Sequence, residues 1–517
     1  MSESRAFWKR PGLALALLLV ADAALMVFGV ARSWPLNPFV TLLQGDALEY
    51  WEWAERISHG AWVGDTPFLS APLYPYLLGL LRALGCDLPA AFLLHGVMRA
   101  ATAALLYRFA TRACGRPAYG LITAALFLLL LEPAFFVARI VPASLQLLLV
   151  AGLLEAARCA DQRRTHTRLI GVGALIGLNV LANPPMLLFL PLLPLWLGWR
   201  TSAGWKAAGV TACAALLTIA PATLHNALAT RSTAAGAEFI LVSAQSGVTY
   251  AHGHGPGAIG VYRGIPGVSQ DRRRQNQEAY ALAAAATGEA GWKATDRYFL
   301  RQGWDWVRKN PGDALLLHLR KAGFLLFGEN YGDLSVPTLE LRDLALPRAV
   351  PWPLGFLQTG WLLPAAFAGA WWSWRRRGRS LVPVLGALLI PCAVVLIFWY
   401  SPRYRLPLIV PVCLLAPVGV HAAITLRNLG LRIAALGLLT LLPVAGRLWM
   451  QESGLDDAGR FQPEYEFQFG FHLLSEGRAA EAIPRLERAV AAGHDLALAH
   501  EILGRAHVGQ AAARAKA

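Results

Sequence analysis

The apolar stretches of this chain are separated by polar junctions, and arginine and lysine gather at every second junction. The clusters are Arg5, Lys9 and Arg10; Arg108, Arg112 and Arg116; Arg158, Arg163, Arg164 and Arg168; Arg200 and Lys206; Arg375, Arg376, Arg377 and Arg379; and Arg427 and Arg432. Short loops of membrane proteins that are rich in these residues stay in the cytoplasm. The alternate junctions are therefore predicted to face outward. Because they hold the acidic and polar stretches, any chemistry is expected on that face.

The composition agrees with a chain that crosses a membrane many times. Hydrophobic residues make up 56% of the sequence and charged residues 15%, which excludes an ordinary water-soluble protein. A helical span needs about 20 apolar residues, and about eleven segments approach that length. They are approximately 12–31, 88–111, 118–131, 142–160, 170–182, 185–199, 207–225, 353–374, 381–399, 406–426 and 431–448. We predict an all-α polytopic membrane protein.

An odd number of spans after a cytoplasmic amino terminus places the carboxyl terminus outside. The expected location is the cell inner membrane, with a periplasmic carboxyl end. The first apolar stretch contains Asp22 and no clear cleavage site, so it is predicted to be an uncleaved span. The net charge of +15 lies largely in loops beside spans, so no nucleic-acid partner is expected. The six cysteines lack paired spacing, which argues against a disulfide framework or a zinc site.

Two outward regions, 32–87 and 226–351, carry the polar sequence of the predicted membrane domain, 1–450. The first has helical spacing from Asp46 to Ser58, with acids among tryptophans, which is typical of a helix at the membrane interface. The segment after it, APLYPYLLGLLRALG, is too short to span and is expected to lie on the outer surface. The second region begins with a Gly- and His-rich stretch, which predicts an irregular loop and a candidate lid.

Residues 451–517 are predicted to form a soluble helical tail. Phe469 and Gly470 recur as Leu503 and Gly504, a spacing of 34 residues. This period resembles one tetratricopeptide repeat and the first helix of another. Since free-standing arrays need about three repeats, we expect the tail to pack against the membrane domain or to bind a protein partner.

Two carboxylates on the outward face are candidate catalytic residues. Asp46 begins the predicted interface helix, where an acid either caps the helix or acts as a base on an acceptor hydroxyl. Glu132 belongs to the next outward turn. It is either hydrated at the end of a span, paired with Arg139, or part of the same site as Asp46.

The segment SPRYRLPLIVP places Arg403 and Arg405 around Tyr404 at the outer end of a span. A guanidinium group suits bidentate binding of a phosphate, and the alternative is a side chain that only reaches the interface to be hydrated. Lys321 is a further candidate for the same anion, with the same alternative.

Two histidines of the second outward region, His252 and His254, have a spacing that would allow metal binding, but no third ligand stands near them. No metal site is predicted, and a requirement for a divalent cation or another cofactor stays open.

Together these positions resemble the GT-C superfamily of membrane glycosyltransferases, in particular the bacterial relatives of protein O-mannosyltransferases and of the lipid A aminoarabinose transferase. The resemblance covers about residues 12–448. It rests on Asp46 with Tyr50 one turn later, the segment Pro72 to Tyr76, the Asn183–Pro184 turn and the motif Arg403 to Pro407.

This resemblance implies a GT-C-like bundle that transfers a hexose or pentose from a polyprenyl-phosphate carrier to a lipid, glycan or protein at the outer face. It implies that Asp46 acts on the acceptor, with Glu132 as the second acid. The family pattern has two adjacent acids, whereas Ala47 follows Asp46 here, so the second carboxylate stays open. The implied substrate contacts are Arg403, Tyr404, Arg405, Lys321, Tyr50 and Tyr74.

A transporter or flippase of lipid-linked glycans is the alternative. Such a protein is expected to carry charges along a path through the membrane and to show inverted internal repeats. A glycosyltransferase is expected instead to bring Asp46 and Arg403 into one cavity at the outer surface.

The topology leads to the first testable prediction. A reporter enzyme that is active only in the periplasm, fused after Ala517, should be active because an odd number of spans follows a cytoplasmic amino terminus. Activity of a cytoplasmic reporter at the same fusion point would contradict the assignment of faces.

Overall fold

The computed structural model describes residues 10–33, 38–41, 43, 45–199, 204–269, 272–327, 359–452, 458–492 and 496–516. Its named elements are all helices, and one isolated bridge, between Val261 and Tyr400, is the β-type pairing found among these residues. The all-α polytopic fold predicted from the sequence is confirmed. The predicted outer region 226–351 is described only as far as residue 327.

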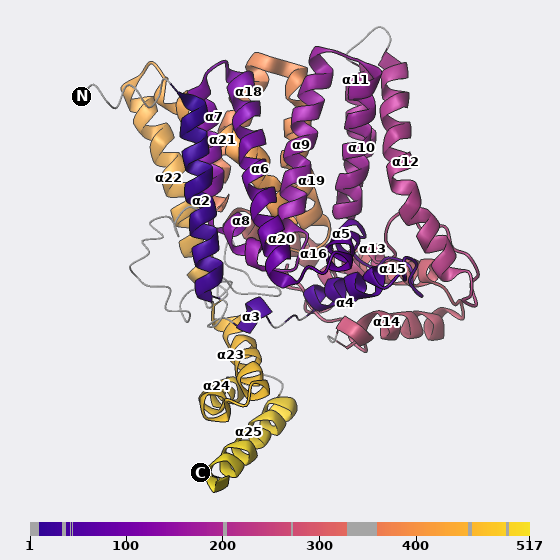
Figure 1. Ribbon diagram of the computed structural model, residues 1–517. Coiled ribbons are helices and arrows are strands. Elements are labelled where there is room, and N and C mark those ends of the chain that lie inside the picture. The colour runs from indigo at the N-terminus through magenta and orange to yellow at the C-terminus, as the bar shows by residue number, and fades with distance from the viewer. Residues whose placement is uncertain are drawn as a thin grey trace.

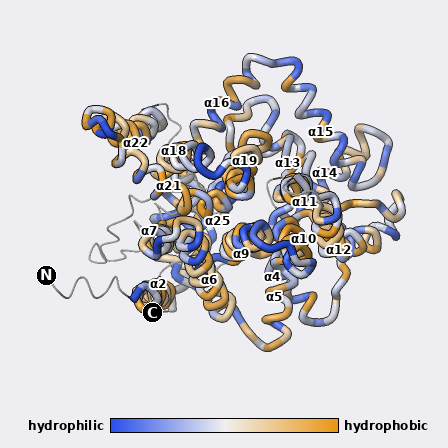
Figure 2. Tube along the Cα trace, turned by 90° about the horizontal axis from the view of Figure 1, so that it is seen from above, coloured by the Kyte–Doolittle hydropathy of each residue, from blue (hydrophilic) through white to orange (hydrophobic). Residues whose placement is uncertain are grey.

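A bundle of roughly parallel apolar helices forms the main body (Figure 1). These helices are α2 (Pro11–Ser33), α6 (Leu88–Cys114), α7 (Pro117–Leu129), α9 (Ala143–Gln162), α10 (His166–Ala182), α11 (Phe189–Trp199), α12 (Gly204–Thr230), α18 (Thr359–Arg377), α19 (Val382–Ile397), α21 (Ile409–Ile424) and α22 (Leu429–Glu452). Seen along the bundle, α2, α12 and α22 lie at its edges and α9, α19 and α21 lie inside (Figure 2).

Seven of the described helical segments have the length and hydropathy of a membrane span. An eighth results if α7 and the short helix after it, which bend by 58°, count as one span. The segment Thr359–Ile397 is one of the seven but contains both α18 and α19. Two further apolar segments, His166–Ala182 and Pro184–Trp199, are shorter and are not among the seven. Each predicted apolar segment therefore overlaps a helix, although 118–131 is interrupted after Leu129, 185–199 is divided between a short 3-10 helix and α11, and residues 353–358 lie outside the described part of the chain.

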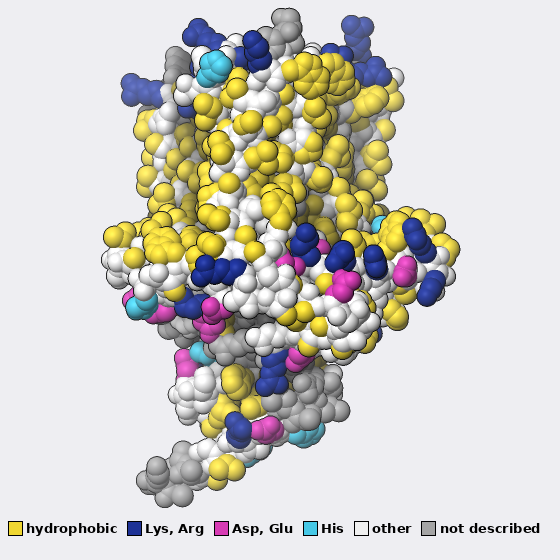
Figure 3. Space-filling model, turned by 90° about the vertical axis from the view of Figure 1, so that its right-hand side faces the viewer, with side chains coloured by type: hydrophobic (Ala, Val, Ile, Leu, Met, Phe, Trp, Pro, Cys, Tyr) yellow, Lys and Arg dark blue, Asp and Glu magenta, His cyan; other side chains and the backbone are white. Residues whose placement is uncertain are grey.

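The two ends of the bundle differ in charge. On the face shown in Figure 3, lysines and arginines gather above the apolar belt, whereas the acidic residues lie below it among further basic ones. Helix α2 starts at the upper end and the tail lies beyond the lower end (Figure 1). This separation of charge is the pattern from which the orientation was predicted, and the orientation itself stays a prediction.

Helices that lie across the lower end form a platform. They are α3 (Pro38–Thr41), α4 (Asp46–Ser58), α5 (Leu73–Ala83), α13 (Ser246–Gly253), α14 (Arg272–Thr287), α15 (Trp292–Lys309) and α16 (Pro311–Phe327) (Figure 1). The bounds of α4 are those predicted from the sequence. The Gly- and His-rich stretch after α13 is mostly irregular, as expected from its composition.

Below the platform, the tail contains α23 (Ala458–Ser475), α24 (Ala479–Ala491) and α25 (Leu496–Lys516). Its core includes Ala482, Leu486 and Ala489, and a side chain at Gly470 would meet the Leu486 side chain at 2.8 Å. The tail also contacts the membrane domain, because Tyr465 stacks on Phe39 of α3 with ring centroids 5.4 Å apart. The predicted packing against the membrane domain is confirmed, while the tetratricopeptide assignment stays a prediction.

Small residues allow the spans to approach closely. A Cβ atom at Gly369 of α18 would lie 2.0 Å from the Leu415 carbonyl oxygen of α21, and one at Gly419 would lie 1.9 Å from that of Ala365. Between helices in lipid, such contacts replace the hydrophobic effect as a source of attraction. They hold α21, and with it the segment that precedes α21, at a defined depth in the bundle.

An ion pair joins α2 and α6 within the bundle. Arg99 of α6, 2% exposed, donates hydrogen bonds to both carboxylate oxygens of Asp22 of α2, at 2.8 Å from Nη2 to Oδ1 and 3.0 Å from Nε to Oδ2, and another to the Leu128 carbonyl. A lone charge at the centre of a span costs several kcal/mol. The pair therefore fastens the peripheral helix α2 to α6 and α7.

This arrangement predicts that replacing one partner of the pair lowers the free energy of unfolding more than replacing both partners. Asp22→Leu should lower the free energy of unfolding by about 3 kcal/mol or more because it leaves the Arg99 charge buried without its partner. The double variant Asp22→Leu/Arg99→Leu should recover most of the loss. The measurement is the unfolding midpoint in detergent for both variants, and equal midpoints for wild type and Asp22→Leu would show that the pair is not structural.

Candidate functional site

A cavity of about 1290 Å³ opens where the platform meets the spans. Its walls come from α3 and α4, the starts of α9 and of the short helix η2 (Pro184–Leu188), α13, α14, the end of α19, the short helix α20 (Pro402–Arg405) and α23. Segments from the whole length of the chain therefore meet at this one place. Asn183 and Pro184, which form an outward turn in the sequence, belong to its wall.

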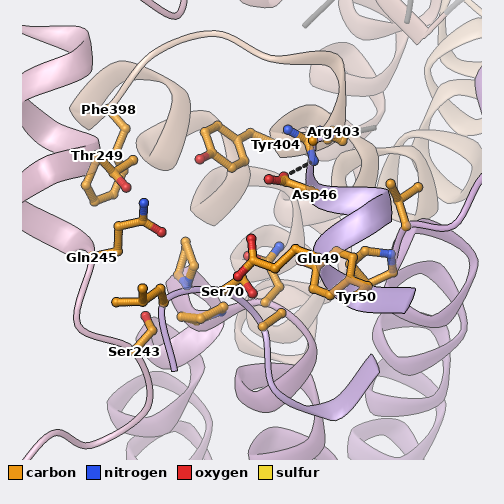
Figure 4. Close-up of a pocket in the computed structure, with 18 of the residues that line it drawn as sticks. Asp46, Glu49, Tyr50, Ser70, Ser243, Gln245, Thr249, Phe398, Arg403 and Tyr404 are labelled. Carbon is orange, nitrogen blue, oxygen red and sulfur yellow. Dashed lines mark hydrogen bonds and ion pairs between the residues drawn. The ribbon is translucent and has the colours of Figure 1, made fainter. Parts of the chain in front are cut away.

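Asp46 enters the cavity at the first turn of α4. Gly45 precedes the helix with φ of 53°, a conformation that glycine adopts without strain. No side chain caps this helix end, so Asp46 does not serve as the capping residue considered from the sequence. Its carboxylate complements the helix dipole and points at Arg403 instead (Figure 4).

Arg403 contacts Asp46 although the two residues are 357 positions apart in the sequence. The Ser401 hydroxyl accepts a hydrogen bond from the Arg403 backbone N–H at 3.2 Å and thereby shapes the turn of α20. Arg403 Nη1 donates to Asp46 Oδ2 at 2.7 Å, and the two side chains are 20% and 21% exposed. The structure thus brings together the two residues that the sequence singled out as base and phosphate ligand.

Tyr404 and Tyr50 also line the cavity. Tyr404 packs against Trp399, with ring centroids 4.9 Å apart. Tyr74 does not belong to the wall: it is fully buried behind Tyr50, with its hydroxyl 2.9 Å from His95 Nε2. A direct substrate contact by Tyr74 is therefore not supported by its position.

Arg405 and Glu132 pair with each other away from the cavity. Arg405 is 2% exposed, and its Nη2 lies 3.4 Å from Glu132 Oε1. The same carboxylate oxygen accepts from the Thr359 backbone N–H at the start of α18, at 3.0 Å, while Arg405 donates to the Leu325 carbonyl of α16. Neither residue is in the cavity wall. Their contacts favour a role in joining α16, α18 and α20 rather than the direct roles expected from the sequence.

Lys321 is buried behind the wall as well. Its Nζ lies 3.0 Å from His254 Nε2 and 3.4 Å from the Leu396 carbonyl. Burial lowers the pKa of Lys321 to about 7, and burial together with the nearby lysine lowers the pKa of His254 to about 3. The Lys321 ammonium does not line the cavity, so it has no direct path to an anion bound there.

The histidines of the Gly-rich stretch are separated by these contacts. His254 faces Lys321, whereas His252 Nδ1 lies 2.7 Å from the Arg263 carbonyl and its ring lines the cavity. Within the described residues, no group of three or more His, Cys, Asp or Glu side chains is placed to hold a metal ion.

The sequence reasoning missed the neutral polar residues of the cavity. Ser243 and Gln245 precede α13, Thr249 lies within it and Asn276 belongs to α14, and all of them line the wall. No spacing or charge pattern distinguishes such residues in a sequence. The available indication of a functional role was their position in the first half of the predicted outward region 226–351.

No protein-family model matches this chain, and no curated protein matches its sequence. Among solved structures, the oligosaccharyltransferase AglB from Archaeoglobus fulgidus, in complex with an inhibitory peptide and a dolichol-phosphate, shares 13% identity over 87% of this chain and 58% of its own, with a TM-score of 0.43.

A second structure of an oligosaccharyltransferase from that organism, in complex with Zn and sulfate, shares 15% identity over 83% of this chain and 52% of its own, with a TM-score of 0.41. A third, tethered to an acceptor peptide containing the NVT sequon, shares 14% identity over 90% and 58%, with a TM-score of 0.42. This chain spans little more than half of those chains. Likeness at this level does not decide the function, which has to be read from the cavity itself.

The buried Lys321–His254 contact predicts how stability depends on pH. Both pKa values in the folded state lie below the ordinary ones of 10.5 and 6.5, so the unfolded chain takes up protons first. The free energy of unfolding should then fall as the pH drops from about 10.5 to 7 through Lys321, and from about 6.5 to 3 through His254.

Unfolding midpoints in detergent across this range test the prediction. Lys321→Met should flatten the alkaline part of the curve, whereas Lys309→Met, at an exposed position on α15, should leave it unchanged. An unaltered alkaline slope in Lys321→Met would mean that the ammonium keeps its ordinary pKa in the folded protein.

Proposed function

We propose that this protein is a glycosyltransferase that moves a sugar from a polyprenyl-phosphate carrier to an acceptor at the outer face of the membrane. The observation that carries the proposal is the meeting of Asp46 and Arg403 in one cavity at the end of the spans. A base for an acceptor hydroxyl and a cation for a leaving phosphate are the two groups that this transfer needs.

The apolar part of the wall suits a lipid carrier. Leu188 of η2 and Ile397 of α19 line the cavity and are 46% and 47% exposed. Large apolar side chains at the level of the belt favour contact with hydrocarbon over water. We propose that the prenyl tail enters along this side, which leaves the phosphate within the cavity.

The proposed reaction uses the chain's own side chains in two roles. The acceptor hydroxyl attacks the anomeric carbon of the sugar, and the bond from that carbon to the phosphate oxygen breaks. Asp46 takes the proton of the hydroxyl, and the carrier leaves as polyprenyl phosphate with its charge stabilised by Arg403. Low dielectric at the membrane interface strengthens both contacts.

The ion pair between Asp46 and Arg403 has to open before this reaction. While Arg403 donates to Asp46, the same guanidinium edge is not available for phosphate and the carboxylate is a weaker base. Donor binding draws Arg403 toward phosphate and releases Asp46 toward the acceptor. The donor is therefore expected to bind before the acceptor.

The flippase alternative gains no support from the interior of the bundle. Asp22 and Arg99, an ion pair within the spans, bind each other and do not line the cavity. They form a structural contact rather than a path for a polar headgroup.

The proposal predicts opposite effects of two substitutions on donor affinity. Asp46→Asn should lower transfer about 10²-fold or more because it removes the base. The same change should tighten binding of a short-chain polyprenyl phosphate by up to about tenfold, since Arg403 no longer has a competing carboxylate. Arg403→Ala should weaken that binding about ten- to a hundredfold, the loss of one charge-assisted contact, and Arg403→Lys should restore only part of it.

Titration calorimetry with geranyl phosphate, and transfer assays with its sugar ester and an extract of envelope acceptors, provide both measurements. Asp65→Asn is the matched control because Asp65 is exposed in the same loop and does not line the cavity. Wild-type transfer in Asp46→Asn, or wild-type donor affinity in Arg403→Ala, would refute the proposed roles.

A further inference from the structure

The cavity has two chemically different walls. The α4 wall carries the carboxylates of Asp46, Glu49 and Glu52. The opposite wall, built by α13, α14 and the end of α19, carries amides and aromatic rings. Figure 4 shows Gln245 and Thr249 across an open gap from Asp46, Arg403 and Tyr404.

The amides of this second wall lie close together. Gln245 Nε2 donates to Asn276 Oδ1 at 3.1 Å, and Gln275 Nε2 donates to the Tyr262 hydroxyl at 2.6 Å. We call Gln245, Gln275 and Asn276 the amide wall. Each carboxamide offers donors and an acceptor, so the wall matches groups that both donate and accept, as sugar hydroxyls do.

Three rings continue the amide wall toward Arg403. Tyr262 packs edge to face on Trp399 at 5.4 Å between centroids, and Trp399 packs on Tyr404 at 4.9 Å. We call these rings the aromatic strip, and all three line the cavity. The strip ends at the residue next to Arg403, so a group bound along it would extend directly from a phosphate held by that arginine.

The charges of the cavity select against an anionic sugar. A carboxylate or sulfate on the sugar would share the cavity with Asp46, Glu49 and Glu52, and Arg403 is the one arginine or lysine among the described residues of the lining. Anionic ligands are normally matched by charge-assisted partners, and like charges at short range are costly. A sugar ring without a negative charge avoids the repulsion.

We infer that the amide wall and the aromatic strip form the binding subsite for the sugar of the donor, and that this sugar carries no negative charge. The inference rests on the proposed function and adds to it the class of sugar and the residues that select it. The aromatic strip contacts the apolar face of the ring, and Gln245 and Asn276 hydrogen-bond its hydroxyls.

The test compares the affinity of the purified protein for three probes. They are geranyl phosphate alone, geranyl phosphate carrying mannose, and the same compound carrying glucuronate. The wild-type protein should bind the mannose compound about tenfold or more tightly than geranyl phosphate, and the glucuronate compound more weakly than the mannose compound, because a hydroxyl-matched site rejects groups it cannot pair.

Substitutions in the amide wall should remove the gain from the sugar alone. Gln245→Leu and Asn276→Leu should each reduce the preference for the mannose compound roughly tenfold, the effect of one lost hydrogen bond that leaves a polar group without a partner. Their affinity for geranyl phosphate should stay within about twofold of wild type. Gln245→Glu, nearly isosteric, should act in the same direction and guards against misfolding of the leucine variants.

Gln302→Leu, the same change at an exposed position of α15 outside the cavity, is the matched control. An unchanged sugar preference in all three wall variants, or tighter wild-type binding of the glucuronate compound than of the mannose compound, would overturn the inference while leaving the proposed function in place. Failure of wild type to bind geranyl phosphate in any of these forms would instead overturn the proposed function, and the subsite with it.

Discussion

The constraint on which this structure depends is the cost of charge inside an apolar bundle. Water is absent from the belt, so a charged group there has to find a partner within the protein. Asp22 binds Arg99 between α2 and α6, and Glu132 binds Arg405 where α8 (Leu131–Phe135), α16 and α20 meet. Each pair joins helices that are far apart in the chain and thereby selects one arrangement of the bundle.

Close packing of the spans then determines the geometry at the platform end of the bundle. Because Gly369 and Gly419 bring α18 and α21 into backbone contact, the segment before α21 has little freedom. That segment is α20, whose buried Arg405 fixes the helix from within while Arg403 projects into the cavity. Two arginines separated by one residue thus have different positions: Arg405 is buried and holds the turn, and Arg403 faces the cavity.

The cavity combines three environments within one volume. Apolar side chains line one part of it, a carboxylate and a guanidinium meet in its wall, and amides and rings cover the far side. A lipid-linked sugar has the same three parts in the same order, namely the tail, the phosphate and the hydroxylated ring. This correspondence ties the proposed reaction to the proposed sugar subsite, and the contact between Phe39 and Tyr465 brings the tail to the edge of the same cavity.

The sequence alone determined the all-helical membrane fold, the helix from Asp46 to Ser58 and the choice of Asp46 and Arg403, because hydropathy, helical period and charge at loops are local properties of the chain. The tertiary structure alone decided that Glu132, Arg405 and Lys321 lie behind the wall and that Gln245 and Asn276 form part of it. Whether an ionisable side chain of a loop turns inward to a partner or outward to a ligand depends on which distant helix packs against it. Neutral amides have no sequence pattern that indicates a binding site. Only the packing of α13, α14 and α19 around one cavity shows that they line it.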